Sequence, residues 1–170
     1  TQGTQCSLLS EIPNLNPYKY KNSLYILLTH LFLHQVEQFE NVTKYNLRNI
    51  PLKVVVKAQD YQLKQCYMHK DSYLGNMHKE GLYEDIIGVG LYYYQIDQGI
   101  NGGELELSSV IKVKDTHFTE GATSLKNINI KVKEEMSLVF SNDHCFHRVM
   151  RLNGNGSRKI IAFFLLRPKQ

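Results

Sequence analysis

The sequence predicts a mainly β fold with one or two helices, arranged as a double-sheet jelly roll. Near the N-terminus a single amphipathic segment precedes a chain that otherwise has the pattern of short strands. Those strands, about eight in number, are separated by glycine-rich and asparagine-rich turns of the kind that connect hairpins. The 170 residues suffice for one hydrophobic core. We therefore expect a single domain over 1–170, with 1–51 as an N-terminal arm and helix and 52–168 as the jelly-roll core.

The N-terminal part predicts an arm followed by one helix. Residues 1–22 contain Pro13, Pro17 and several asparagines without periodicity, which indicates an irregular arm on the domain surface. From Ser23 to about Tyr45 apolar residues recur every three or four positions, and Ser23 is a candidate cap. This stripe predicts a helix that covers one face of a sheet. Its apolar residues are Leu24, Leu27, Leu28, Leu31, Phe32, Val36 and Phe39.

The predicted strands occupy most of the chain after residue 51. Their β-branched and aromatic runs favour extended backbone, and turn-prone residues bound them. Ile128, Ile130 and Val132 alternate with polar residues, as in a sheet with one face in water. The predicted strands are Leu52 to Ala58, Ile86 to Ile96, Gly103 to Leu107, Val110 to Val113, Ile128 to Val132, Ser137 to Phe140, Phe146 to Leu152 and Arg158 to Leu166.

Composition narrows the function classes. Hydrophobic residues at 42% and charged residues at 21% are ordinary for a globular protein, and the most apolar stretch, Leu24 to Leu33, is too short to span a membrane. The net charge of +4 comes from scattered basic residues, which gives only weak support for a nucleic-acid groove. Three cysteines without paired spacing predict neither a disulfide framework nor a zinc knuckle, and they favour a reducing, intracellular compartment.

Potential metal ligands occur first in a short loop. His78 and Glu80 are two residues apart, so in extended backbone both side chains leave the same face and can meet one ion. Gly75 and Gly81 bracket the pair with flexible backbone, as a loop that surrounds a metal requires. A His-x-Glu triplet recurs by chance, and a solvated loop is the alternative reading of these residues alone.

The C-terminal segment adds a third ligand and a cation. His147 lies on one predicted strand and Arg158 near the start of the next, with a glycine hairpin at Asn153 to Gly156 between them. We expect the two strands to pair, which would bring both side chains within reach of one small anion. Two imidazoles and one carboxylate can occupy one face of an octahedral Fe(II), which leaves positions open for a keto acid and dioxygen. A guanidinium offers a planar fork of donors for the far carboxylate of such an acid.

Several stretches support this hypothesis together. They are Leu52 to Lys57, His78 to Gly81, Gly90 to Tyr94, Phe140 to Asn142, His147 to Val149 and Arg158 to Pro168. With these stretches the chain resembles the Fe(II)- and 2-oxoglutarate-dependent dioxygenase superfamily, and within it the DUF4246 family of uncharacterised proteins. The resemblance covers about residues 52 to 168.

The resemblance implies a fold, a reaction and a set of site residues. The fold is the double-stranded β-helix, a cupin-like jelly roll, and the reaction uses Fe(II), 2-oxoglutarate and dioxygen to hydroxylate or demethylate a substrate, either a protein or a small molecule. His78, Glu80 and His147 would bind the metal. Arg158 would bind the C5 carboxylate of 2-oxoglutarate, and Tyr94 resembles a tyrosine that in some relatives donates a hydrogen bond to that carboxylate. Glu80 stands where most of the superfamily has an aspartate.

Alternatives remain for some of these residues. Tyr92 shares a face with Tyr94, and Tyr93 is adjacent to it. His144 could replace His147 as the third ligand, although strand alternation and the Arg-Val that follows favour His147. Two further histidines, His30 and His34, lie one helical turn apart and are expected to be packed or solvent-facing.

Two other functions compete with an oxygenase. One is a catalytically inactive jelly-roll module for binding or assembly, and the other is a cupin-like metal protein that uses a different cosubstrate.

Overall fold

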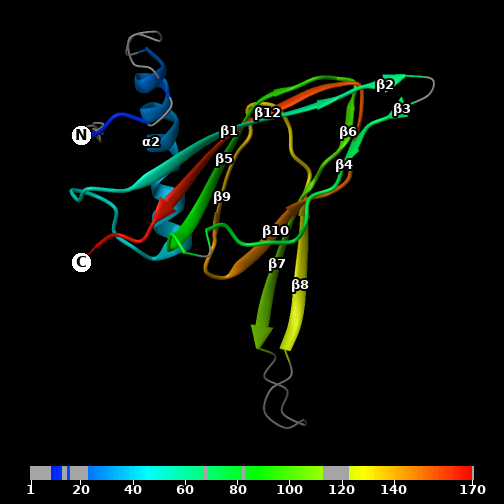
Figure 1. Cartoon of the computed structure of the whole chain (residues 1–170). Coiled ribbons are helices and arrows are strands. Elements are labelled where there is room, and N and C mark those ends of the chain that lie inside the picture. The colour runs from blue at the N-terminus through cyan, green and yellow to red at the C-terminus, as the bar shows by residue number, and fades with distance from the viewer. Residues whose placement is uncertain are drawn as a thin grey trace, which may run out of the picture.

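The computed structural model describes residues 9–12, 15, 23–66, 69–81, 83–112 and 123–169, and most of the predicted N-terminal arm lies outside these ranges. Within them, one helix precedes two antiparallel sheets and several short strands (Figure 1). The predicted class, a mainly β jelly roll with one or two helices, is confirmed, and the described residues contain one helix. No helix in these ranges is both long enough and apolar enough to cross a membrane.

Two sheets form the body of the molecule, and every strand pair in them is antiparallel. The four-stranded sheet has the order β1 (Val54–Leu63), β12 (Gly156–Leu166), β5 (Ile86–Ile96) and β9 (Ser137–Ser141). The three-stranded sheet has the order β10 (Cys145–Val149), β7 (Leu105–Lys112) and β8 (Thr123–Ile130). Figure 1 shows the β7–β8 hairpin extending past the ends of the other strands.

The winding of the chain between the two sheets is that of a jelly roll. His78 forms an antiparallel bridge with His147 and so extends the three-stranded sheet at its β10 edge. Eight core segments are numbered here in chain order, as β1, the bridge segment at His78, β5, β7, β8, β9, β10 and β12. In the four-stranded sheet, the first, eighth, third and sixth of these segments lie side by side. In the other sheet, the second, seventh, fourth and fifth lie side by side. Apart from the β7–β8 hairpin, neighbouring segments in these two sheets are distant in sequence, as in a double-sheet Greek-key arrangement.

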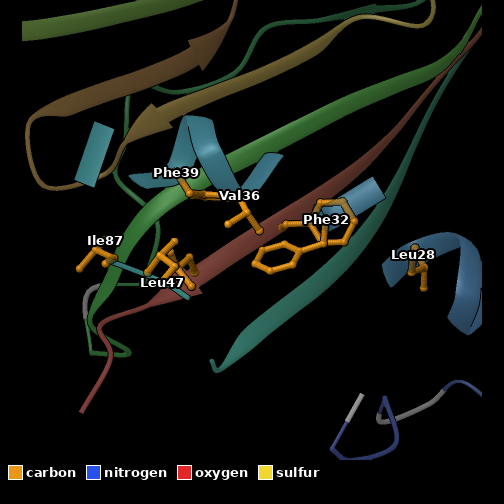
Figure 2. Packing of buried hydrophobic residues seen from close by; sticks show 8 residues of the cluster. Leu28, Phe32, Val36, Phe39, Leu47 and Ile87 are labelled. Carbon is orange, nitrogen blue, oxygen red and sulfur yellow. The ribbon is translucent and has the colours of Figure 1, made fainter. Parts of the chain in front are cut away.

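The helix α2 (Ser23–Thr43) covers the outer face of the four-stranded sheet. Its buried residues Leu28, Phe32, Val36 and Phe39 are part of one hydrophobic cluster (Figure 2). The sheet contributes Ile87, Phe163 and Leu165 to the same cluster. Full burial of one such side chain contributes about 1.5–3 kcal/mol, so this cluster fixes the helix on the sheet. The predicted stripe is confirmed at its buried positions, whereas Leu27 is exposed.

A second hydrophobic cluster contains residues from both sheets. The three-stranded sheet contributes Leu105, and the four-stranded sheet contributes Ile86, Val89, Phe140, Ala162 and Phe164. This cluster is the interior of the jelly roll. Side chains that point inward from either sheet can therefore meet one another.

Five short strands lie outside these two sheets in the described part of the chain. Four of them are β2 (Gln65–Cys66), β3 (His69–Lys70), β4 (Ser72–Tyr73) and β6 (Ile100–Gly102). β2 pairs with β3, while β4 and β6 pair with either side of β11 (Leu152–Gly154). The predicted strands Gly103 to Leu107 and Val110 to Val113 form one continuous strand, β7, as far as Lys112, and Val113 lies outside the described residues.

One sequence prediction about strand pairing is wrong. The predicted strand Phe146 to Leu152 divides into β10 and β11, and β11 leads the chain from one sheet to the other. As a result β10 pairs with β7, while β12 pairs with β1 and β5. His147 and Arg158 therefore lie in different sheets and not on paired neighbouring strands.

Candidate metal centre

Three predicted ligands converge at the edge of the three-stranded sheet. His78 Nε2 lies 3.2 Å from Glu80 Oε1, and His147 Nε2 lies 3.3 Å from the same oxygen. One ligand atom from each of the three residues lies within 4.8 Å of the other two. The His147 side chain is 8% exposed and that of His78 is 48% exposed, so the group is buried on one side and open on the other.

Backbone pairing brings the two histidines together. His78 N donates to His147 O at 3.0 Å, and His147 N donates to His78 O at 2.8 Å. Residues paired directly across an antiparallel bridge direct their side chains to the same face. The two imidazole centroids consequently lie 4.4 Å apart. The bridge joins residues 69 positions apart (147 minus 78), so no local pattern could have indicated it.

The imidazole of His78 has a partner that fixes its orientation. Its Nδ1 lies 2.7 Å from Asn76 O, and a carbonyl can only accept, so Nδ1 carries the proton. A metal would bind through the other nitrogen, Nε2, which lies 3.2 Å from Glu80 Oε1. His147 packs against the ring of Phe140 at 4.9 Å, and its buried Nδ1 has no hydrogen-bond partner among the described residues.

The carboxyl of Glu80 is held in its charged form. The hydrogen bond with His147, together with the charges of both imidazoles, lowers the pKa of Glu80 from its ordinary value, although burial opposes that shift. A carboxylate between two imidazole nitrogens is the donor set of non-haem iron sites that retain open positions. The chemistry of these residues therefore fits Fe(II).

Arg158 lies inside the jelly roll and has two free donors. It is 1% exposed, and its Nη1 donates to Gly103 O at 2.6 Å. Its Nε and Nη2 have no hydrogen bond of good geometry within the described part of the chain, although the phenol of Tyr61 lies near enough to raise the pKa of Arg158 against the effect of burial. These two nitrogens share one edge of the guanidinium, and that edge is the fork that binds both oxygens of a carboxylate.

Gly103 makes the position of the guanidinium possible. A Cβ at this residue would lie 2.4 Å from Arg158 Nη1, and the backbone φ of 75° is one that favours glycine. A side chain at residue 103 would therefore displace the guanidinium. From the sequence, Gly103 was predicted only as the first residue of a strand.

Tyrosines surround the guanidinium. Arg158 Cζ lies 5.1 Å from the ring centroid of Tyr61 and 5.7 Å from that of Tyr93, and the rings of Tyr61 and Tyr73 are 4.8 Å apart. Burial raises the pKa of Tyr61 and of Tyr93 to about 12, so both phenols are neutral at physiological pH. Burial also lowers the pKa of Arg158. In the described residues no carboxylate pairs with Arg158, and a buried cation of this kind is costly until an anion binds.

The structure brings Tyr93, and not Tyr94, to the guanidinium. Tyr94 is 42% exposed, whereas Tyr93 is 1% exposed. Lys159 pairs with Gln95 and the next residue, Ile160, pairs with Tyr93, so the register shifts by one residue and Tyr94 is left unpaired in a β-bulge. If side chains alternated strictly along β5, Tyr94 would lie on the same face of the sheet as Arg158. Because of the bulge, Tyr93 lies on that face instead.

The remaining predicted histidines lie apart from the three ligands. His144 is exposed in the turn between β9 and β10, and His30 and His34 are exposed on α2. None of them belongs to the group of ligands that converge. Sequence reasoning also gave no role to Tyr61, because the predicted strand ended at Ala58 where Gln59 and Asp60 interrupt the apolar run.

Comparisons with known proteins support the fold only. No family model matches the chain, and no curated protein matches its sequence. The structure is similar to the crystal structure of a bsmA homolog from Methylobium petroleophilum PM1, with a TM-score of 0.53, 13% identity, and coverage of 89% of this chain and 53% of that one. A prolyl 4-hydroxylase structure from Phytophthora capsici gives a TM-score of 0.47 and 17% identity, with coverage of 84% and 44%.

The chain thus spans about half the length of each of these structures. At 13% identity the bsmA homolog shows a shared fold, and the prolyl 4-hydroxylase is too distant for further argument. Membership of the dioxygenase superfamily and of the DUF4246 family stays a prediction.

Proposed function

We propose that this chain is an Fe(II)- and 2-oxoglutarate-dependent oxygenase that hydroxylates or demethylates a substrate not yet identified. The observation that supports the proposal best is a pair of complementary features within one jelly roll. Three metal-ligand atoms converge within 4.8 Å, and a buried guanidinium presents two donors without partners. Either feature alone occurs in other kinds of protein. Together they match a metal ion and a dicarboxylate that binds to it.

In this proposal Fe(II) and 2-oxoglutarate carry out the oxidation, and the residues of the chain bind and orient them. When bound, Fe(II) and 2-oxoglutarate supply the oxidation, in which dioxygen is consumed and succinate and carbon dioxide are formed. His78, Glu80 and His147 would hold the metal on one face. The Nε and Nη2 donors of Arg158 would bind the far carboxylate of the keto acid.

Burial at the site supports this division of roles. Arg158, Tyr93 and His147 are buried, so the cosubstrate end is shielded from water and charge interactions there are strong. His78 is the exposed member of the metal ligands. We expect the substrate to approach from the His78 side, where the group of ligands is open.

The test of this proposal measures first the binding of Fe(II) and 2-oxoglutarate and then the formation of succinate. Wild-type protein, anaerobic and freed of metal, is titrated with Fe(II) and 2-oxoglutarate, and succinate is measured after oxygen is admitted. We expect both ligands to bind and succinate to form, with metal affinity lowered by more than about 100-fold in His147→Ala and 2-oxoglutarate affinity lowered by about 100-fold in Arg158→Met. Absence of metal binding by wild type, or unchanged binding by His147→Ala, would refute the proposal. Binding of both ligands without succinate, even in the presence of candidate substrates, would favour the inactive binding module.

A further inference from the structure

Asn142 is a buried polar residue immediately after β9, and its side chain is fully engaged with two other segments. Its Oδ1 accepts a hydrogen bond from Glu80 N at 2.9 Å. Its Nδ2 donates to Glu80 O at 2.9 Å and to Ile86 O at 2.8 Å. Both amide hydrogens and one acceptor site are therefore used. This pattern fixes the orientation of the amide, since a flipped group would place its NH₂ against an N–H and its oxygen against two carbonyls.

The backbone of Glu80 depends on these bonds. Glu80 lies between the bridge at His78 and the start of β5, where none of the described residues takes part in strand pairing. The next residue, Gly81, has a φ of 53°, so the chain turns sharply there. Among the described residues, Asn142 is the hydrogen-bond partner of both Glu80 N and Glu80 O. Without it, the N–H and C=O of this half-buried residue would lose their partners.

Asn142 is itself anchored to the four-stranded sheet. Its backbone N donates to Ile87 O at 2.9 Å, and the preceding Ser141 pairs with Gly88 in β5. The two imidazole ligands, in contrast, are fixed by the bridge at the edge of the three-stranded sheet. The carboxylate ligand is thus joined to one sheet and the nitrogen ligands to the other. The Asn142 side chain is the direct hydrogen-bonded link from the four-stranded sheet to the carboxylate residue.

We infer that Asn142 is a positioning residue for Glu80 and that it sets the affinity of the site for a divalent metal. The inference rests on the proposed metal site. By holding both backbone groups of Glu80, Asn142 keeps the carboxylate against the two imidazoles. Loss of a partner that orients a ligand commonly weakens metal affinity by about 10–100-fold, and we expect an effect in that range.

The test uses Co(II), whose visible absorption reports its coordination, with the full chain as the protein. Asn142→Ala is expected to weaken Co(II) binding by about 10–100-fold and to change the absorption spectrum. The matched control is Gln35→Ala, which also removes a buried amide, here one that donates to Leu91 O and Ser137 Oγ on the helix side of the same sheet. Both variants are expected to unfold at lower temperature, and only Asn142→Ala is expected to lose metal affinity. If Asn142→Ala does not fold, Asn142→Ser, which keeps one short polar group, takes its place in the same comparison.

A double-mutant cycle separates positioning from general stability. If Asn142 acts through Glu80, then adding Asn142→Ala to Glu80→Ala changes Co(II) affinity by less than about two-fold. An equal additional loss in that background, or wild-type affinity in Asn142→Ala itself, would overturn the inference while leaving the proposed function intact. Failure of wild-type protein to bind Co(II) would instead overturn the proposed function and the inference together, so the outcomes are distinct.

Discussion

The two ends of the candidate site are built from different kinds of structure. Arg158 lies on β12, an 11-residue strand paired on both sides by β1 and β5, and is 1% exposed. His78 and Glu80 lie on a segment with a single bridge to the sheet, and His78 is largely exposed. A group on a doubly paired strand is held rigidly, whereas a group on a loop depends on particular hydrogen bonds. The end proposed to bind the cosubstrate, at Arg158, is thus preorganised. At the end proposed to bind the metal, the positions of the ligands depend on a few contacts.

The largest effect is expected at the metal end. His147→Ala removes the buried imidazole, and loss of a direct ligand exceeds the loss of an orienting partner, so Co(II) affinity should fall by more than about 100-fold. The matched control is His144→Ala, which removes an exposed histidine three residues away and should leave the affinity unchanged. The measurement is a Co(II) titration followed by absorbance. A loss of affinity in His144→Ala equal to that in His147→Ala would contradict the assignment.

At the cosubstrate end, one substitution should separate stability from binding. Arg158→Met removes a buried cation whose Nε and Nη2 have no partner, so the metal-free protein should gain about 1–2 kcal/mol in free energy of unfolding despite the lost bond to Gly103. Affinity for 2-oxoglutarate should fall by about 100-fold because a charge-assisted fork is lost. Urea denaturation and calorimetric titration measure the two effects. A destabilised Arg158→Met protein, or one with unaltered 2-oxoglutarate affinity, would show that the guanidinium has a structural role.

A smaller effect should distinguish two adjacent tyrosines. Tyr93→Phe removes a phenol beside the guanidinium and should weaken 2-oxoglutarate binding by about ten-fold, the size of one hydrogen bond to a charged group. Tyr94→Phe removes an exposed phenol and should change the affinity by less than about two-fold. Calorimetric titration of the two variants in parallel provides the comparison. The reverse order of effects would mean that the bulge does not form as described.

The last prediction concerns the pH dependence of stability. Burial raises the pKa of Tyr61 and Tyr93 to about 12 in the folded protein, from an ordinary value of 10.0. Between these values the folded state keeps protons that the unfolded state has released, so the free energy of unfolding should fall as the pH rises from 10 to 12. Tyrosinate absorbance should show two late-ionising groups in the folded chain and a single transition in denaturant. Ionisation of every tyrosine in one step in the folded chain would contradict the buried environment around Arg158.

Local patterns were sufficient to predict some features. Ile86 to Ile96 was predicted with the bounds that β5 has, because its apolar and tyrosine-rich run ends at turn-prone residues on both sides. The ligand pair His78 and Glu80 was also visible from spacing, since two residues apart means one face in extended backbone. The helix α2 followed from its apolar stripe, and its buried residues confirm that interpretation.

Long-range pairing could not be read from the sequence. A bulge in β5 depends on its register with β12, some 65 residues later, and it decides whether Tyr93 or Tyr94 faces Arg158. The short strand β11 likewise separates β10 from β12 because it pairs with β4 and β6. Asn142 belongs to one of the stretches that carry the resemblance, yet its role could not be predicted, since that role arises from contact with Glu80, 62 residues away. These features are tertiary, so local propensity does not report them.

The most direct test of the account measures whether the two ends of the site act on one ligand. Calorimetric titration of 2-oxoglutarate is performed on metal-free and Co(II)-loaded wild-type protein, and on His147→Ala and Arg158→Met in the presence of Co(II). We predict that the metal strengthens 2-oxoglutarate binding by at least about ten-fold, that His147→Ala removes this gain, and that Arg158→Met weakens binding by about 100-fold even with Co(II) present. Binding of 2-oxoglutarate that is equally tight with and without metal, or no binding by wild type in either state, would contradict the account.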